Sequence, residues 1–281
     1  MIEPLPDLLI APVVQAALAE DLGRAGDVTS QACVPAEARL RCVFASRQSG
    51  VVAGLACARL AIAALDPSAD FKAVVEDGAR VGPGDKLAWV DANARALLSA
   101  ERVGLNLLGR LSGVASLTRA YVDLVEGTGA IIVDTRKTTP GLRALEKYAV
   151  RCGGGVNHRF GLDDAILIKD NHIAACGSVG EAVRRAKAAV GHLMKVEVEI
   201  DGLGQLEDAL KYGPDVVMLD NFALSDLAEA VRRTAGRAVL EASGGVNLET
   251  VRAIAETGVD VISVGALTHS AVVLDIGLDA A

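Results

Sequence analysis

The second half of the chain repeats one pattern, in which a short run of Val, Ile and Leu is followed by a loop and an amphipathic helix. Continuous apolar runs of this length are typical of parallel strands whose two faces are both covered. Parallel strands joined through helices require crossovers, so the pattern predicts an α/β domain with a parallel sheet. The expected strands are 130–133, 165–168, 195–200, 215–219, 238–241 and 260–264, with helices at 179–190, 205–210, 224–234 and 248–257.

Residues 1–115 have a different organisation, with short β-like runs among helical segments. The expected strands are 40–45, 50–53, 71–76 and 85–90, and a helix is expected at 57–65. The apolar spacing of residues 92–125 predicts a long helix, broken near Gly113. The change of pattern predicts two domains, an N-terminal α/β domain at 1–115 and an α/β domain at 116–281, whose last residues can pack back on the first.

Polar or glycine residues follow nearly every expected strand of the second domain. An open sheet gathers its ligand groups at a switch point, whereas a barrel collects them from all strands into one mouth. The even spread therefore predicts a TIM-like α/β barrel that, with six strands, is either incomplete or recruits a further strand. The strand-end residues are Asp134–Lys137, Lys169–His172, Glu197 and Glu199, Asp220–Asn221, Ser243–Gly245, and Gly265–Ala266.

Several basic side chains lie at these strand ends in a protein whose formal net charge is −8. The overall charge disfavours binding to nucleic acid or an anionic membrane, and an aromatic content of 3% disfavours base stacking. Two cations about 6 Å apart repel by about 3 kcal/mol at an effective dielectric of 20. A shared pocket therefore needs a compact, multiply charged anion; otherwise the side chains pair separately with local acids. The residues are Arg136, Lys137, His158, Arg159 and Lys169.

Acidic residues at the strand ends predict a magnesium site. Glu197 and Glu199 are two apart on one expected strand and so point to the same face, and Asp220 ends the next. Glu199 and Asp220 lie nearer the strand ends and are the better ligands for Mg²⁺, together with substrate phosphates. The alternative for these carboxylates is ion pairing with Lys169 or Arg159.

The remaining motifs leave alternatives open. The glycine turns at 243–246 and 263–267 suit phosphate binding through backbone N–H groups, although such turns are also common without a ligand. Lys169 could instead form a Schiff base with a carbonyl substrate. His158 and His172 could be general acids or bases, or orienting hydrogen-bond donors.

Cysteine usage and the N-terminal sequence predict a cytoplasmic protein. The five cysteines form no CxxC pair, which favours reduced thiols over disulfides or a zinc site. Residues 1–12 lack the basic and apolar regions of a signal peptide, and no apolar stretch reaches the length of a membrane helix.

Three motifs together resemble the quinolinate phosphoribosyltransferase family. They are Asp134-Thr-Arg-Lys-Thr-Thr-Pro-Gly-Leu-Arg143, Glu146-Lys-Tyr-Ala-Val-Arg-Cys-Gly-Gly-Gly-Val-Asn-His-Arg159 and Leu167-Ile-Lys-Asp-Asn-His172. Further similar segments extend the resemblance from Glu20-Asp-Leu-Gly23 to Gly265-Ala-Leu-Thr-His-Ser270. The resemblance implies an N-terminal α+β open sandwich, an incomplete six-stranded barrel, and a homodimer in which the first domain of one subunit closes the barrel mouth of the other.

The resemblance also implies a reaction: quinolinate and phosphoribosyl pyrophosphate (PRPP) give nicotinate mononucleotide, CO₂ and pyrophosphate, with Mg²⁺. Arg136, Arg159 and Lys169 would hold the two carboxylates, with His158 nearby and Arg102 of the partner subunit completing the pocket. The implied PRPP and Mg²⁺ site comprises the catalytic residues Lys137, Glu199 and Asp220 with Ser243, Gly244, Gly245, Gly265 and Ala266. Two alternatives are a molybdenum-operon-type paralogue that uses another heterocycle and a non-catalytic regulator that binds a phosphometabolite.

Overall fold

The computed structural model describes residues 2–281, which form two compact units. Unit 1 comprises three segments: the chain up to Arg119, Thr138–Gly154 and Leu267–Ala281. Unit 2 comprises two segments, Ala120–Lys137 and Gly155–Ala266. Among the described residues, no helix is both long enough and apolar enough to cross a membrane.

Unit 2 is built on a six-stranded, all-parallel sheet with the order β6-β11-β10-β9-β8-β7. Each strand lies where the sequence predicts one, to within a few residues. The strands are β6 (Ile131–Val133), β7 (Ile166–Ile168), β8 (Val196–Ile200), β9 (Val216–Asp220), β10 (Val239–Ser243) and β11 (Val261–Ser263).

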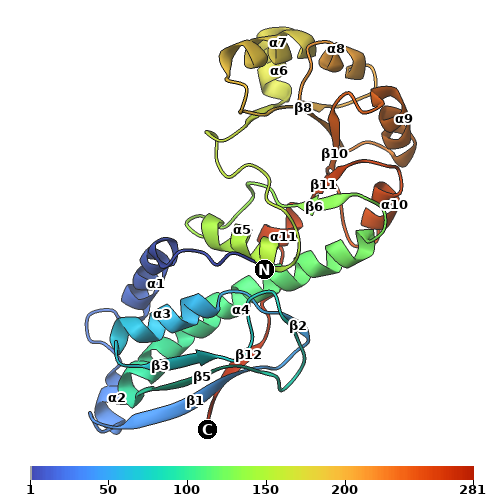
Figure 1. Cartoon of the computed structure of the whole chain (residues 1–281). Helices are drawn as coiled ribbons and strands as arrows, with labels where there is room; N and C mark the ends of the chain where they lie inside the picture. Colours follow the sequence, from blue (N-terminus) through green and yellow to red (C-terminus); the bar gives the residue numbers. More distant parts are fainter. Residues whose placement is uncertain (1) are drawn as a thin grey trace. The chain divides into compact units, whose positions relative to one another are not determined.

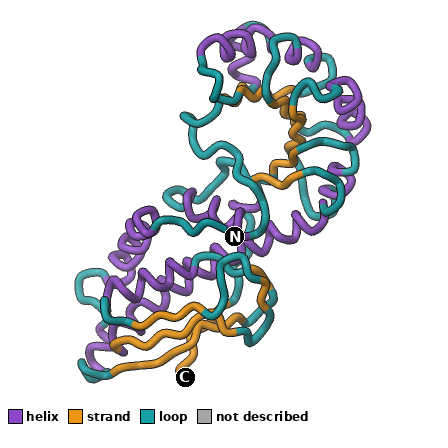
Figure 2. Tube along the Cα trace, viewed as in Figure 1, coloured by secondary structure: helices purple, strands orange, loops and turns teal. Residues whose placement is uncertain are grey.

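Helices cover the outer side of this sheet, which curves into an incomplete barrel (Figure 1). They are α6 (Asp170–Cys176), α7 (Val179–Ala189), α8 (Leu206–Leu210), α9 (Leu224–Thr234) and α10 (Val251–Ala255). Within the described residues the edge strands β6 and β7 do not pair with each other, and Figure 2 shows loop between them. The expectation of an incomplete TIM-like α/β barrel with six strands is confirmed.

Unit 1 is an α+β open sandwich around the antiparallel sheet β12-β1-β5-β3. In Figure 1, α3 and α4 run along one face of this sheet. The strands of unit 1, including a separate pair formed by β2 and β4, are β1 (Arg39–Ser46), β2 (Gly50–Val51), β3 (Asp70–Ala73), β4 (Arg80–Val81), β5 (Lys86–Asn93) and β12 (Ile276–Ala280). The helices of unit 1 are α1 (Asp7–Leu22), α2 (Val28–Cys33), α3 (Leu55–Leu65), α5 (Arg143–Cys152), most of α4 (Ala94–Val125) and most of α11 (Ala266–His269).

The expected break in α4 near Gly113 is wrong, because the helix is continuous from Ala94 to Val125. Gly109 and Gly113 lie one turn apart on the same helix face. A Cβ at Gly109 would lie 2.9 Å from the carbonyl oxygen of Leu274, and one at Gly113 would collide with the carbonyl of Val272. The two glycines therefore let the segment 272–274 cross close to the helix, and its N–H at Leu274 donates to the Gly109 carbonyl at 3.0 Å.

A buried carboxylate on α5 in unit 1 joins this helix to α4 and to the loop at Thr139. Glu146 is fully buried, and its Oε1 accepts hydrogen bonds from Arg110 Nη2 at 2.8 Å and from Thr139 Oγ1 at 2.8 Å. Its Oε2 accepts the backbone N–H of Thr139 at 2.9 Å. A buried carboxylate is tolerated only with such partners, so the glutamate of this motif has a structural role in unit 1.

Ser178 caps the N-terminus of α7, where its hydroxyl accepts the backbone N–H of Glu181 at 3.2 Å. We expect Ser178→Ala to lower the free energy of unfolding by about 1 kcal/mol, because one helix N–H loses its acceptor. Ser178→Asp keeps an acceptor and is the control. Urea denaturation measures both, and equal midpoints for the alanine and aspartate variants would contradict the role of the cap.

Candidate active site

A pocket of about 620 Å³ lies in unit 2 at the carboxyl ends of the parallel strands. The sequence predicts this position for a site, because the loops that follow the strands of a barrel meet at one mouth. The predicted site residues that line the pocket are Arg136, Lys137, His158, Arg159, Lys169, Glu199, Asp220, Ser243, Gly244 and Gly245.

Asp134 organises the part of the pocket that carries the arginines. Its side chain is fully buried and accepts the backbone N–H of His158 at 2.9 Å and the side-chain amide of Asn157 at 2.7 Å. Next to these contacts, Val133 and Val156 form an isolated parallel β-bridge. The end of β6 is thereby joined to the loop at 156–159, which brings Arg136 and Arg159 to the same pocket although they are far apart in sequence.

The two arginines lack a full set of partners for their guanidinium groups. The Nε atoms of Arg136 and Arg159 are both buried, and neither has a hydrogen-bond partner. Burial, followed by the nearby charge of Arg136, lowers the pKa of Arg159. Buried guanidinium donors that repel each other and lack acceptors are suited to an anionic ligand, and a planar carboxylate matches their geometry.

Lys169 and Glu199 form an ion pair across the pocket, with Nζ and Oε2 2.6 Å apart. The ion-pair alternative for the strand-end acids therefore holds for this pair. Lys169 is also the N-cap residue of α6, and its backbone N–H donates to Nδ1 of His172 at 2.9 Å. His172 thus has a structural partner at the start of α6 and is not among the residues that line the pocket.

Asp220, Asn221 and Gly244 form a tight turn region beside the ion pair. Asn221 has a positive φ of 56°, and its side-chain amide donates to Asp220 Oδ2 at 2.8 Å. Gly244 has a φ of 85°, and a Cβ at this position would collide with the Asn221 side chain. Glycine is required at 244 for both reasons, and it leaves the backbone open to close approach by a ligand.

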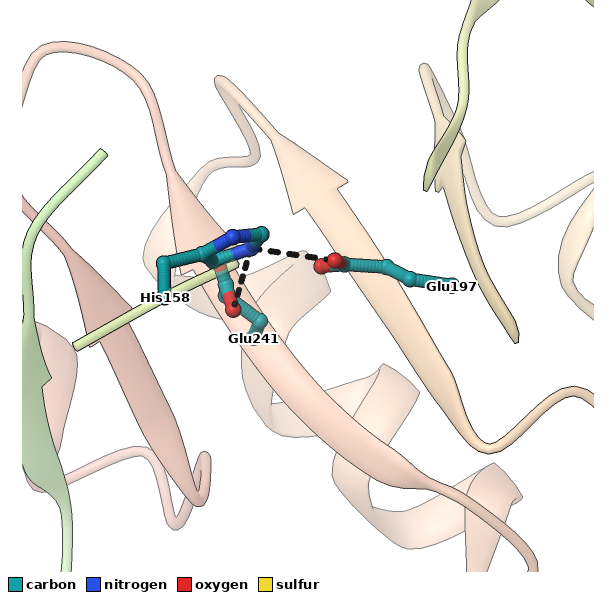
Figure 3. Close-up of side chains that lie close together, drawn as sticks. All are labelled: His158, Glu197 and Glu241. Carbon is teal, nitrogen blue, oxygen red and sulfur yellow. Dashed lines mark ion pairs between the residues drawn. The ribbon is translucent and has the colours of Figure 1, made fainter. Parts of the chain in front are cut away.

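The imidazole of His158 faces the carboxylates of Glu197 and Glu241 (Figure 3). Its Nε2 is 3.0 Å from Glu197 Oε2 and 3.7 Å from Glu241 Oε2. Both glutamates are buried, and burial together with the charge of Glu197 raises the pKa of Glu241. The sequence placed Glu197 on the same face of its strand as Glu199, but it did not single out Glu241. A carboxylate between Leu240 and Ala242 in a buried strand was the available signal.

Three predicted residues are not among those that line the pocket, namely Arg102, Gly265 and Ala266. Arg102 is exposed on α4 in unit 1, Gly265 follows β11, and Ala266 is the first residue of α11. Conversely, Leu167 and Met218 line the pocket and were not predicted. They supply an apolar surface of the kind that packs against an aromatic ring.

Two family models cover almost the entire chain. The quinolinate phosphoribosyl transferase N-terminal domain matches residues 27–112, and the C-terminal domain matches residues 114–279. The chain belongs to the quinolinate phosphoribosyltransferase family. The resemblance inferred from the sequence motifs is therefore confirmed.

Curated relatives and solved structures agree with this assignment. The chain is 50% identical over 271 residues to the nicotinate-nucleotide pyrophosphorylase [carboxylating] of Mycobacterium leprae, covering 95% of each chain. It is 46% identical over 260 residues to the probable enzyme of that name from Bacillus subtilis, covering 92% of this chain and 89% of the relative. The structure of the nicotinate-nucleotide pyrophosphorylase from Francisella tularensis superposes with a TM-score of 0.95 at 38% identity, covering 100% of this chain and 99% of that one.

Proposed function

We propose that this chain is an enzyme of NAD biosynthesis, a pentosyltransferase that converts quinolinate and PRPP to nicotinate mononucleotide, CO₂ and pyrophosphate. The observation that carries the proposal is the pair of buried, unpartnered guanidinium Nε atoms of Arg136 and Arg159 in one pocket. Quinolinate is a planar dicarboxylate, so it supplies the acceptors that these donors lack. Family membership supports the same reaction.

The basic side of the pocket would bind quinolinate. Arg136, Arg159 and Lys169 would hold the two carboxylates, while Leu167 and Met218 pack against the pyridine ring. Holding both carboxylates fixes the ring nitrogen relative to the second substrate, which converts a bimolecular encounter into an oriented reaction. The C2 carboxylate can leave as CO₂ once the ring nitrogen is quaternised, because the positive ring accepts the electron pair.

The acidic and glycine-rich side would bind PRPP. Lys137 would stabilise the pyrophosphate leaving group, and the open backbone around Ser243, Gly244 and Gly245 can donate to the 5-phosphate. This arrangement needs no protein nucleophile, because the positively charged ribosyl transition state is stabilised by charge and position.

Glu199 and Asp220 fit the Mg²⁺ that this chemistry calls for. They are carboxylates at the ends of the neighbouring strands β8 and β9, and both line the pocket. Carboxylate oxygens shared with substrate phosphates are the usual ligands of Mg²⁺. When bound, Mg²⁺ would neutralise charge on the pyrophosphate. The Lys169 ion pair and the Asn221 amide orient these two carboxylates.

The Schiff-base alternative for Lys169 is disfavoured by its ion pair with Glu199. Nζ is engaged by Glu199 Oε2 at 2.6 Å, and neither quinolinate nor PRPP offers the aldehyde or ketone that a Schiff base needs. Lys169 is accordingly assigned to carboxylate binding.

We also propose that the enzyme is a cytoplasmic homodimer whose active sites are shared between subunits. Arg102 is exposed and is not among the residues lining the pocket of its own chain. In the proposed assembly, Arg102 of the partner subunit reaches the quinolinate site. All five cysteines are free thiols, which suits a reducing compartment.

The test is a chromatographic assay of the purified protein with quinolinate, PRPP and Mg²⁺. We expect nicotinate mononucleotide from quinolinate, none when nicotinate replaces it, and none when a chelator removes the metal. A folded protein that makes no product from quinolinate but uses another heterocyclic acceptor would be the paralogue instead. Ligand binding to the protein without turnover of any acceptor would identify a regulator.

A further inference from the structure

The cluster of His158, Glu197 and Glu241 has no role in the proposed reaction. The three ligand atoms lie within 4.8 Å of one another, a separation that would also suit a metal ion. The carboxylate atoms Glu197 Oε1 and Glu241 Oε1 are buried without hydrogen-bond partners. Buried carboxylate oxygens without partners are costly, so this arrangement calls for a function.

The hydrogen bond at the other ring nitrogen argues against a metal in this cluster. The backbone N–H of Arg159 donates to His158 Nδ1 at 2.8 Å, so Nδ1 must present its lone pair. In a neutral imidazole the ring proton is then on Nε2, where it faces Glu197 Oε2 at 3.0 Å. A histidine that binds a metal through Nε2 needs the opposite tautomer, with the proton on Nδ1.

The same contacts form a continuous chain from the glutamates to the quinolinate pocket. Glu197 accepts from the imidazole, and the imidazole in turn accepts from the backbone of Arg159. The Arg159 guanidinium is held further along by Nη1, which donates to the carbonyl of Ala165 at 3.1 Å. Losing the carboxylate would free the imidazole to rotate or change tautomer, and the backbone of Arg159 would lose its acceptor.

We propose that Glu197 and Glu241 are positioning residues that act through His158 to hold Arg159 in place for a carboxylate of quinolinate. The inference rests on the proposed function and deepens it. It assigns His158 an orienting role, because both ring nitrogens have protein partners. Glu241 contributes the second carboxylate, whose Oε2 lies 3.7 Å from the same Nε2 of His158.

Two substitutions separate positioning from overall stability. Glu197→Leu keeps a buried apolar volume but removes the acceptor, and we expect the KM for quinolinate to rise about tenfold to a hundredfold. The KM for PRPP should change less than about twofold, because the contacts described above lead from Glu197 through His158 to Arg159. Glu241→Gln keeps the side-chain size and an oxygen that can face His158 Nε2, so its KM for quinolinate should stay within about threefold of wild type.

A matched control is Glu207→Gln, an exposed glutamate on α8 that pairs with Arg237 at 3.0 Å. It should leave both KM values unchanged. A structural role alone would lower the folded fraction and kcat of Glu197→Leu without separating the two KM values, and that result would overturn the proposal. An equal rise in the KM for quinolinate in Glu241→Gln and Glu197→Leu would also overturn the proposal.

The tautomer can be measured without any substrate. The chain has four histidines, so ¹⁵N-labelled histidine gives a simple long-range ¹H–¹⁵N spectrum, and His158→Gln assigns the signal. We expect the Nε2–H tautomer in the wild type and a mixture in Glu197→Leu. An Nδ1–H tautomer in the wild type would overturn the inference even if quinolinate is turned over. Absence of turnover with the expected tautomer would instead overturn the proposed function alone.

Discussion

Replacing Arg136 by alanine should lower kcat/KM for quinolinate by about thirty-fold to several thousand-fold, as expected for removing one partner of a buried charge pair at about 2–5 kcal/mol. The Arg136 Nε is already buried and unpartnered in the pocket, so a substrate carboxylate is the acceptor that completes it. Steady-state kinetics with quinolinate as the varied substrate measure the effect.

The control for this variant is Arg232→Ala, which removes an exposed arginine that pairs with Glu229 on the outer helix α9. It should leave kcat/KM unchanged. Arg136→Lys keeps the charge but loses the planar fork, so its activity should fall between those of the wild type and the alanine variant. An Arg136→Ala enzyme with wild-type kcat/KM would remove Arg136 from the quinolinate site.

Replacing Lys137 by alanine should lower kcat by about a hundredfold to a thousandfold, the usual loss when a group that stabilises transition-state charge is removed. The KM for quinolinate should change little, because this lysine is assigned to the leaving pyrophosphate rather than to the pyridine. Initial rates with both substrates saturating measure the change in kcat.

Lys195→Ala is the matched control, because Lys195 pairs with Asp215 at 3.1 Å and is not among the residues that line the pocket. Its kcat should equal that of the wild type. If Lys137→Ala instead raises the KM for quinolinate with an unchanged kcat, Lys137 belongs with the carboxylate-binding residues.

The parallel strands were predictable because their signal is local. Val196–Ile200 and Val216–Asp220 are apolar runs of strand length, and burial on both faces requires that composition. The continuity of α4 through Gly113 was not predictable in the same way. The reason for that glycine is the approach of residues 272–274, which are about 160 positions away in sequence.

In the pocket, too, some features were predictable from the sequence and others were not. Arg136 follows the expected strand 130–133, whereas Arg159 follows no expected strand, and the family resemblance was what implied that the two share a site. In the structure, the buried Asp134 holds the loop at 156–159 against the end of β6 and so brings Arg159 to the pocket. The ion pair of Lys169 with Glu199 and the contact of His158 with Glu197 join residues that are about 30 to 40 positions apart in sequence. Which acid meets which base depends on strand order and side-chain direction, and neither is written in the spacing of residues along the chain.

The sequence by itself determined the fold class, the family and most of the residues that line the pocket, because these depend on local apolar periodicity and on contiguous motifs. Only the tertiary structure decided which side chains are partners inside the pocket. It assigned Glu241 to the histidine, and it left the Nε atoms of Arg136 and Arg159 without acceptors. Burial and distance between residues remote in sequence set both properties, so they exist only once the barrel has formed.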